Sequence, residues 1–106
     1  MTRAPFFVPA LLRFPASAAR QDGWGRLIQI TAGGVELSTA VHLEKDADVE
    51  LQFELGGERL SLSGRVLHAE RDDDGHCLAE LRWTGMLERR RLARVLVDVL
   101  ARAART

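Results

Sequence analysis

The chain has 106 residues, of which 46% are apolar and 28% are charged, and its formal net charge is zero. These values are ordinary for a soluble globular protein, and they predict a single domain over residues 1–106. No apolar stretch approaches the ~20 residues of a membrane span, and the lone Cys77 excludes an internal disulfide, so we expect no membrane insertion and a reducing, cytoplasmic location.

Most of the chain is typical of short antiparallel strands. Pro5 and Pro9 disfavour a helix at the start, so the chain is expected to begin as an extended arm. Beyond the arm, apolar and polar residues alternate, and glycine pairs or acidic turns separate the alternating runs. The expected elements are an arm over 1–9 and strands over 10–16, 24–31, 35–39, 49–55, 60–70 and 77–83.

The apolar period changes near the C-terminus from that of a strand to that of a helix. Five apolar residues recur at helical spacing on one face, and Thr84 is the expected N-cap. We therefore predict a mainly β fold, a small six-stranded antiparallel β-barrel over 10–83 with a C-terminal α-helix over 86–103 packed on one opening or face. The predicted inner face of the helix consists of Leu92, Val95, Leu96, Val99 and Leu100.

The sequence indicates no catalytic or metal site. His76 and Cys77 are neighbours on a predicted strand, so their side chains point to opposite faces and are poorly placed to share a proton. His42 and His68 lack metal-ligand spacing, and the run 72–74 lacks the other ligands of a calcium loop. We expect a non-enzymatic protein without a cofactor.

Charge is unevenly distributed: residues 1–43 carry +2, residues 44–80 carry −7 and residues 81–106 carry +5. Four arginines lie at the predicted helix start, where they oppose the helix dipole, so they favour a role at an interface with a partner. A single-stranded nucleic-acid binder on a small barrel is an alternative interpretation, but the acidic middle strands would repel a phosphate backbone. The four are Arg89, Arg90, Arg91 and Arg94.

Four stretches occur in a characteristic order along the chain. They are RAPFFVP (3–9), LIQITAGGVELST (27–39), LSGRVLHAE (62–70) and LAELRWTGMLERRRLARVL (78–96). Their order and spacing resemble the PilZ domain, the bacterial receptor module for the second messenger cyclic di-GMP, from about Arg3 to Leu100. The resemblance implies a small barrel with a helix and a regulatory role in motility, surface attachment or envelope regulation.

Two motifs bind the ligand in the family that this chain resembles. The first is Arg-x-x-x-Arg before the first strand, where Arg3 matches the first arginine and Phe7 replaces the second. The second is (Asp/Asn)-x-Ser-x-x-Gly at the end of the second strand, where Gln29 replaces the acid or amide, Thr31 replaces the serine and Gly34 matches the glycine. The resemblance therefore implies a degenerate ligand site at these five positions.

The altered positions predict a lower affinity for cyclic di-GMP. Phe7 has no donor for phosphate or guanine, and Gln29 offers one carbonyl where an Asp would accept two guanine N–H groups. Losing one charged partner costs roughly 2–5 kcal/mol, or about 30- to 3000-fold in affinity. We expect weak or lost cyclic di-GMP binding and a protein–protein adaptor, with Phe6, Phe7 and the four helix arginines as the candidate interface.

The alternative hypothesis is a working cyclic di-GMP receptor that uses Arg3, Thr31 and Gly34 with a substitute cation. In that case the glycine pair after Thr31 is part of a binding corner, and otherwise it is an ordinary turn on the same scaffold. The candidate substitute cations are Arg13, Arg20 and Arg26.

Overall fold

The computed structural model describes residues 3–104, with only the backbone described for residues 3–7. This part of the chain contains six strands followed by one helix. The elements are β1 (Arg3–Arg13), β2 (Gly23–Ile30), β3 (Gly34–Thr39), β4 (Asp48–Leu55), β5 (Glu58–Arg71), β6 (Cys77–Trp83) and α1 (Met86–Ala104).

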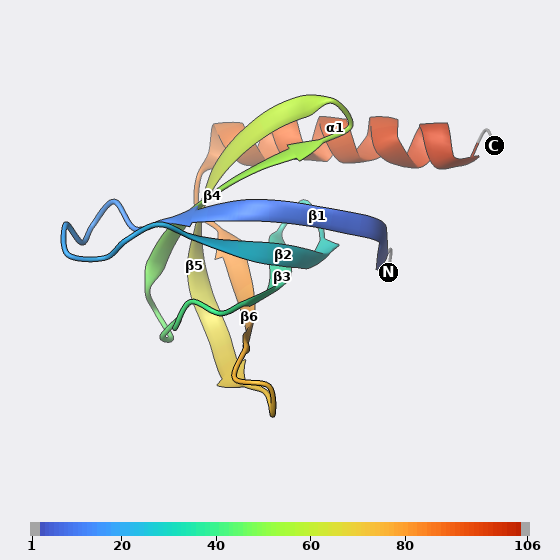
Figure 1. Cartoon of the computed structure of the whole chain (residues 1–106). Coiled ribbons are helices and arrows are strands. Elements are labelled where there is room, and N and C mark those ends of the chain that lie inside the picture. The colour runs from blue at the N-terminus through green and yellow to red at the C-terminus, as the bar shows by residue number, and fades with distance from the viewer. Residues whose placement is uncertain (1–2, 105–106) are drawn as a thin grey trace.

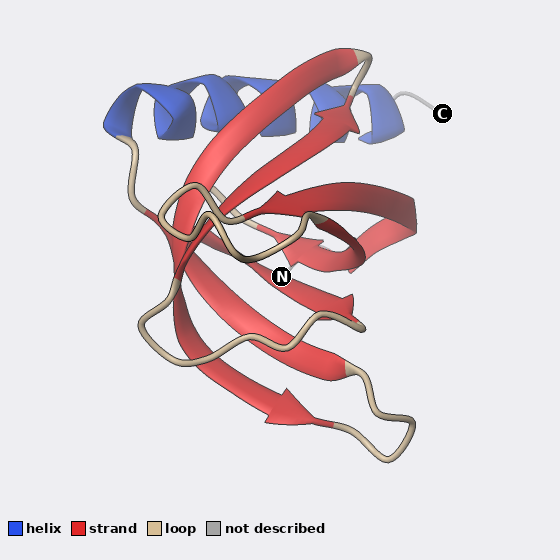
Figure 2. Ribbon diagram, turned by 60° about the vertical axis from the view of Figure 1, so that its left-hand side comes forward, coloured by secondary structure: helices blue, strands red, loops and turns tan. Residues whose placement is uncertain are grey.

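The six strands form a closed antiparallel barrel in the order β1-β2-β3-β6-β5-β4. β1 closes the barrel, because its backbone pairs with β2 on one side and with β4 on the other. Figures 1 and 2 show the strands curving round one interior, with α1 lying along the β4–β5 hairpin. The predicted fold class, a small six-stranded antiparallel barrel with a C-terminal helix, is confirmed.

Alternation of apolar and polar side chains explains why these segments form a barrel. In β4, Val49, Leu51, Phe53 and Leu55 are buried, while the residues between them are half-buried or exposed. β6 repeats the pattern and ends on Trp83, which is 1% exposed. Strands that each turn an apolar face inward share a single core, and closure of the barrel protects their edges.

The N-terminal segment predicted as an extended arm over 1–9 belongs largely to β1. The strand begins at Arg3, whose Cα pairs with that of Gln29 in β2. The register between the two strands shifts between Arg3 and Val8, so the segment is extended but irregular. The first strand starts earlier than predicted because this segment has a partner strand in β2.

The prolines of this region set the limits of β1. Pro9 pairs only with β2, since the ladder with β4 begins at the following residue, Ala10. The missing N–H of Pro9 therefore removes no bond from the β4 ladder. The strand ends at Arg13, before the predicted end at Ala16, because Pro15 lies in the turn that follows.

Helix α1 follows Gly85 and is not capped by Thr84 as predicted. The Gly85 carbonyl accepts a hydrogen bond from the Arg89 N–H at 3.1 Å. The Thr84 hydroxyl instead donates to the Ser63 carbonyl of β5 at 3.2 Å. Thr84 therefore ties the start of the helix to the barrel rather than satisfying the first N–H groups of the helix.

The helix packs its apolar face on the β4–β5 hairpin. Leu92 and Val95 are buried and Val99 is partly buried, whereas Leu100, the last residue of the predicted face, is 46% exposed. Gly56 in the hairpin turn has a left-handed φ of 61°, and a Cβ atom there would lie 2.9 Å from Cγ2 of Val99.

In the described part of the chain, no helix has both the length and the apolar character to cross a membrane.

Replacement of Leu92 by alanine is expected to lower the free energy of unfolding by about 2–5 kcal/mol, because the side chain is 0% exposed and its loss leaves a cavity between helix and barrel. The matched control is Leu87→Ala on the same helix, which is 77% exposed and is expected to change stability by no more than about 0.5 kcal/mol. Urea unfolding followed by circular dichroism measures both. Equal losses would contradict the described packing of the helix.

Candidate functional site

The turn between β2 and β3 is held by the hydroxyl group of Thr31. Its Oγ1 atom accepts hydrogen bonds from the N–H groups of Gly33 at 3.2 Å and Gly34 at 3.1 Å. It also donates to the Gly34 carbonyl at 3.3 Å, and the Thr31 N–H donates to the same carbonyl at 2.9 Å. The hydroxyl that the motif assigns to ligand binding is therefore engaged in shaping its own turn.

Trp83 fixes this turn to the core of the barrel. Its indole Nε1–H donates to the Thr31 carbonyl at 3.1 Å, and its backbone N–H donates to the Gly33 carbonyl at 3.1 Å. The ring stacks on that of Phe53, with centroids 6.3 Å apart and an interplanar angle of 23°. The position of the turn thus depends on a buried aromatic pair rather than on solvent-exposed loop contacts.

The two glycines of the turn have different structural roles. A Cβ atom on Gly34 would lie 2.3 Å from the Leu81 carbonyl oxygen in β6, whereas one on Gly33 would meet nothing closer than 3.9 Å. Neither glycine is among the described residues with positive φ. Close backbone approach, and not a left-handed conformation, is therefore the reason for glycine at position 34.

A hollow of about 380 Å³ lies beside the turn, and we call it the corner site. Gln29, Thr31 and Gly34, three of the predicted ligand positions, line it together. The strand register places Arg3 opposite Gln29, so the backbones of both predicted motifs meet at this corner. The side chains of Arg3 and Phe7 lie outside the described residues.

The corner site has mixed charge. The carboxylates of Glu36 and Glu80 line it from directly paired positions on β3 and β6. Arg82 also lines it and pairs with Gly34 in the register. Among the described side chains, two carboxylates thus face one guanidinium, a balance that opposes the binding of a doubly charged anion.

Arg82 was not among the cations predicted for the site. Its side chain points outward because it alternates with buried Leu81 and Trp83, which is a pattern that the sequence does contain. Its position beside Gly34 depends on the pairing of β3 with β6, which are far apart in the sequence. The outward direction could have been predicted from the sequence, but the neighbouring strand could not.

Two of the predicted substitute cations lie away from the corner site. Arg13 ends β1 and forms an ion pair with Asp22, with 3.4 Å between Nε and Oδ2. Because Arg3 and Arg13 are the two ends of one strand, their Cα atoms are separated by roughly 30 Å of extended chain. The guanidinium of Arg20 lies 4.0 Å from the centre of the Phe14 ring and donates a hydrogen bond to the His42 carbonyl.

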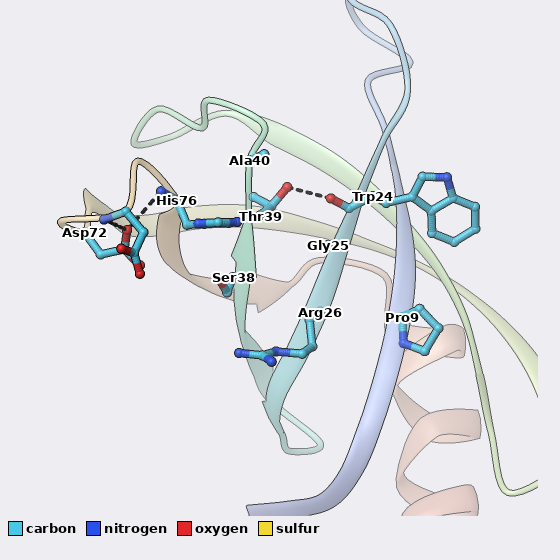
Figure 3. Close-up of a pocket in the computed structure, with 10 residues that line it drawn as sticks. Pro9, Trp24, Gly25, Arg26, Ser38, Thr39, Ala40, Asp72 and His76 are labelled. Carbon is cyan, nitrogen blue, oxygen red and sulfur yellow. Dashed lines mark hydrogen bonds between the residues drawn. The ribbon is translucent and has the colours of Figure 1, made fainter.

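The third predicted cation, Arg26, lines a different hollow of about 600 Å³. Asp72 and His76 line the same hollow from the β5–β6 turn, and Trp24 lines it from β2 together with Arg26 (Figure 3). This hollow shares no lining residue with the corner site. None of the three predicted substitutes therefore lines the corner.

The predicted interface residues of the helix lie in its first turns. Arg91 approaches Glu58 of the hairpin, with 3.9 Å between Nε and Oε2. Arg89, Arg90 and Arg94 are exposed. The side chains of Phe6 and Phe7, the other part of that predicted interface, lie outside the described residues, so their position relative to the helix arginines stays a prediction.

The chain matches the family model of the PilZ domain over residues 2–99. It therefore belongs to the PilZ domain family, as its resemblance in sequence indicated. The family places it among regulatory modules related to cyclic di-GMP, which bind rather than catalyse.

Solved structures show the same fold at low sequence identity. MrkH from K. pneumonia in its apo state has a TM-score of 0.74 at 16% identity, over 98% of this chain and 51% of MrkH. The Bacillus subtilis inhibitor of motility (MotI/DgrA) has a TM-score of 0.71 at 12% identity, over 98% of this chain and 50% of its own. The PilZ domain of CeSA from a cellulose-synthesizing bacterium has a TM-score of 0.63 at 21% identity, over 91% of this chain and 98% of that domain.

The chain spans about half the length of MrkH and of MotI. None of the curated proteins matches it significantly in sequence. At these identities the structural likeness concerns the fold alone, and the arrangement of the corner site has to be judged from the residues of this chain.

Replacement of Gly34 by alanine is expected to destabilise the protein by about 1–3 kcal/mol, because the new Cβ atom would overlap the Leu81 carbonyl and separate β3 from β6. Gly33→Ala, one residue away, is the matched control and is expected to stay within about 0.5 kcal/mol. Urea unfolding gives the stability, and the Trp83 indole signal in NMR reports on the turn. A Gly33→Ala variant as unstable as Gly34→Ala would refute this account of the turn.

Proposed function

We propose that the chain is a non-enzymatic regulatory module of cyclic di-GMP signalling whose own nucleotide site is weak or lost, and which acts as a protein–protein adaptor. The observation that carries the proposal is the composition of the corner site. Its two motifs meet in space, yet Phe7 replaces the second arginine and Gln29 replaces the acid or amide, and carboxylates line the hollow where phosphates would approach.

Two of the motif positions that keep their chemistry, Thr31 and Gly34, also have a structural role. Gly34 is required by the close approach of β6, and the Thr31 hydroxyl is committed to the turn. The positions that would recognise the ligand are Phe7 and Gln29, which provide no guanidinium and no carboxylate. A retained turn therefore does not by itself support a retained ligand site.

A second candidate function, a working cyclic di-GMP receptor, is favoured by one observation. Arg82 lines the corner site opposite Gly34, and no ion pair of the described residues includes it. An arginine in this position could form two charge-assisted hydrogen bonds with a phosphate or with a guanine edge. It would then replace the guanidinium that Phe7 lacks, in place of the three cations predicted from the sequence.

The adaptor role is supported by exposed side chains that the fold leaves without a partner. Leu87 is 77% exposed and Met86 is 67% exposed at the start of α1, beside the arginine cluster. Apolar side chains next to a positive patch are typical of a surface that another protein covers. The helix start is therefore our candidate partner interface.

Calorimetric titration with cyclic di-GMP is expected to give a dissociation constant of tens of micromolar or weaker for the natural chain. The double variant F7R/Q29D restores both motif positions and should gain about 30-fold or more in affinity, because each restored charged pair is worth roughly 2–5 kcal/mol. Arg3→Ala in that background should remove the gain.

Saturable binding of the natural chain at low micromolar concentration would overturn the proposed weak site. Arg82→Ala would then decide the second candidate, since a loss of that affinity would assign the substitute cation to Arg82. A folded F7R/Q29D variant without any gain would show that the replaced residues are not the cause of weak binding.

Charge reversal at the helix start, R90E/R94E, is expected to abolish most crosslinks between the chain and its protein partners in cells of the source bacterium. The matched control K45E/R71E makes the same change in charge on exposed residues away from the helix. Mass spectrometry of the crosslinked partners compares the two. If R90E/R94E leaves every crosslink intact, the helix start is not the interface.

A further inference from the structure

The outer face of the barrel carries a groove of about 550 Å³ lined by residues of β2, β1, β4, β5 and α1. Its centre is a single row of paired residues. Trp24 of β2 pairs with Leu11 of β1. Leu11 pairs in turn with Gln52 of β4, and Gln52 pairs with Ser61 of β5. We call this hollow the Trp24 groove, and it shares no lining residue with the corner site.

Trp24 is 66% exposed, whereas the other tryptophan, Trp83, is 1% exposed and hydrogen-bonded in the core. Pro9 lines the groove beside Trp24, and Leu11 is half-buried beneath it. Figure 3 shows Trp24 and Pro9, which line both this groove and the neighbouring hollow that contains His76. A rigid, exposed tryptophan on a strand is the kind of side chain that dominates the binding energy of protein interfaces.

The polar part of the groove floor is fixed in advance by Glu50. Its Oε1 atom accepts hydrogen bonds from the Gln52 amide at 3.0 Å and from the Ser61 hydroxyl at 2.9 Å. These hydrogen bonds, that of Gln52 above all, hold the pKa of Glu50 below its usual value, so the carboxylate is ionised at neutral pH. A preorganised floor reduces the ordering cost of binding.

The end of the groove next to α1 is positive. Arg59 and Arg91 line it there, together with one acidic residue, Glu54, which pairs with Arg59 in the register. Arg91 lies 3.9 Å from Glu58, and no ion pair of the described residues includes Arg59. Arg94 is three residues further along α1 than Arg91, so it lies on the same side of the helix. The groove therefore has an apolar end at Trp24 and a cationic end at the helix.

We propose that the Trp24 groove docks an extended acidic segment of another protein, an inference that rests on the proposed adaptor role and names its partner by chemistry. An apolar or proline side chain of the segment packs between Trp24, Pro9 and Leu11. Carboxylates a few residues further on meet Arg59 and Arg91, where arginine can bind a carboxylate with two parallel hydrogen bonds.

Charge complementarity favours this occupant over others. A basic segment would be repelled by Arg59 and by the arginines of the helix. A second copy joined by a twofold axis would place the same surface against itself, so its anchor and its carboxylates would both have to come from this face.

A random dodecapeptide library displayed on phage and panned against the whole chain tests the proposal. Peptides that carry an aromatic, aliphatic or proline residue followed by Asp or Glu are expected to be enriched. The best peptide is then synthesised and titrated against the natural chain and four variants. W24A and R59E are expected to weaken its binding at least tenfold.

The controls match those two variants in residue type. V97A removes another exposed apolar side chain, which at 66% is as exposed as Trp24, and R71E reverses a charge at the opposite end of β5 from Arg59. Both are expected to bind within twofold of the natural chain. In NMR spectra of the natural chain, peptide addition should move the indole signal of Trp24 and leave that of buried Trp83 in place. In W24A, an unchanged Trp83 indole signal reports that the variant is folded. Should W24A fail to fold, R59E decides.

Three results would overturn the proposal. They are no enriched peptide, enriched peptides without an excess of acidic residues, or binding of the peptide by W24A and R59E as tight as by the natural chain. Movement of the Trp24 indole signal on addition of cyclic di-GMP, or its burial in a dimer seen by sedimentation, would assign the groove to another occupant. The proposed weak nucleotide site is tested by different signals. If that proposal is wrong, cyclic di-GMP at low micromolar concentration should shift the backbone amide signals of Gly33 and Gly34, not the Trp24 indole signal.

Discussion

The close contact between the Gly34 backbone and the Leu81 carbonyl is the constraint on which the rest of the structure depends. It lets β3 lie against β6, and this pairing joins the half of the barrel made by β1, β2 and β3 to the half made by β6, β5 and β4. With the strands this close, Trp83 can reach the turn and donate to the carbonyls of Thr31 and Gly33. The corner site therefore has a position set by the core, whatever ligand it does or does not bind.

Much of the fold follows from the sequence because local patterns determine it. The alternation of Val49 to Leu55 and the helical spacing after Leu92 decide strand against helix, and both expectations were met. The errors lie where a distant partner decides. β1 starts early because β2 is available to pair with its first residues, and Thr84 bonds to Ser63 of β5 rather than to the helix that follows it.

The site was predictable only as far as its motif. Spacing along the chain identified Thr31 and Gly34, and the register then placed Arg3 opposite Gln29. The position of Arg82 at the corner site follows from the pairing of β6 with β3. The Trp24 groove likewise follows from the pairing of four strands, which places its lining residues in one row. Pairing register is set by the whole barrel, so a motif read along one segment does not contain it.

Both strands that connect the corner site to the Trp24 groove are irregular between the two. On β1 the register shifts between Arg3 and Val8, and on β2 it shifts between Leu27 and Gln29. Beyond these shifts, the row through Trp24 is regularly paired across four strands. Such irregularities bend and twist a strand locally, so the corner site and the groove lie on differently oriented parts of the same two strands. A barrel built in this way can lose the side chains that recognise a nucleotide while the groove on its outer face keeps its shape.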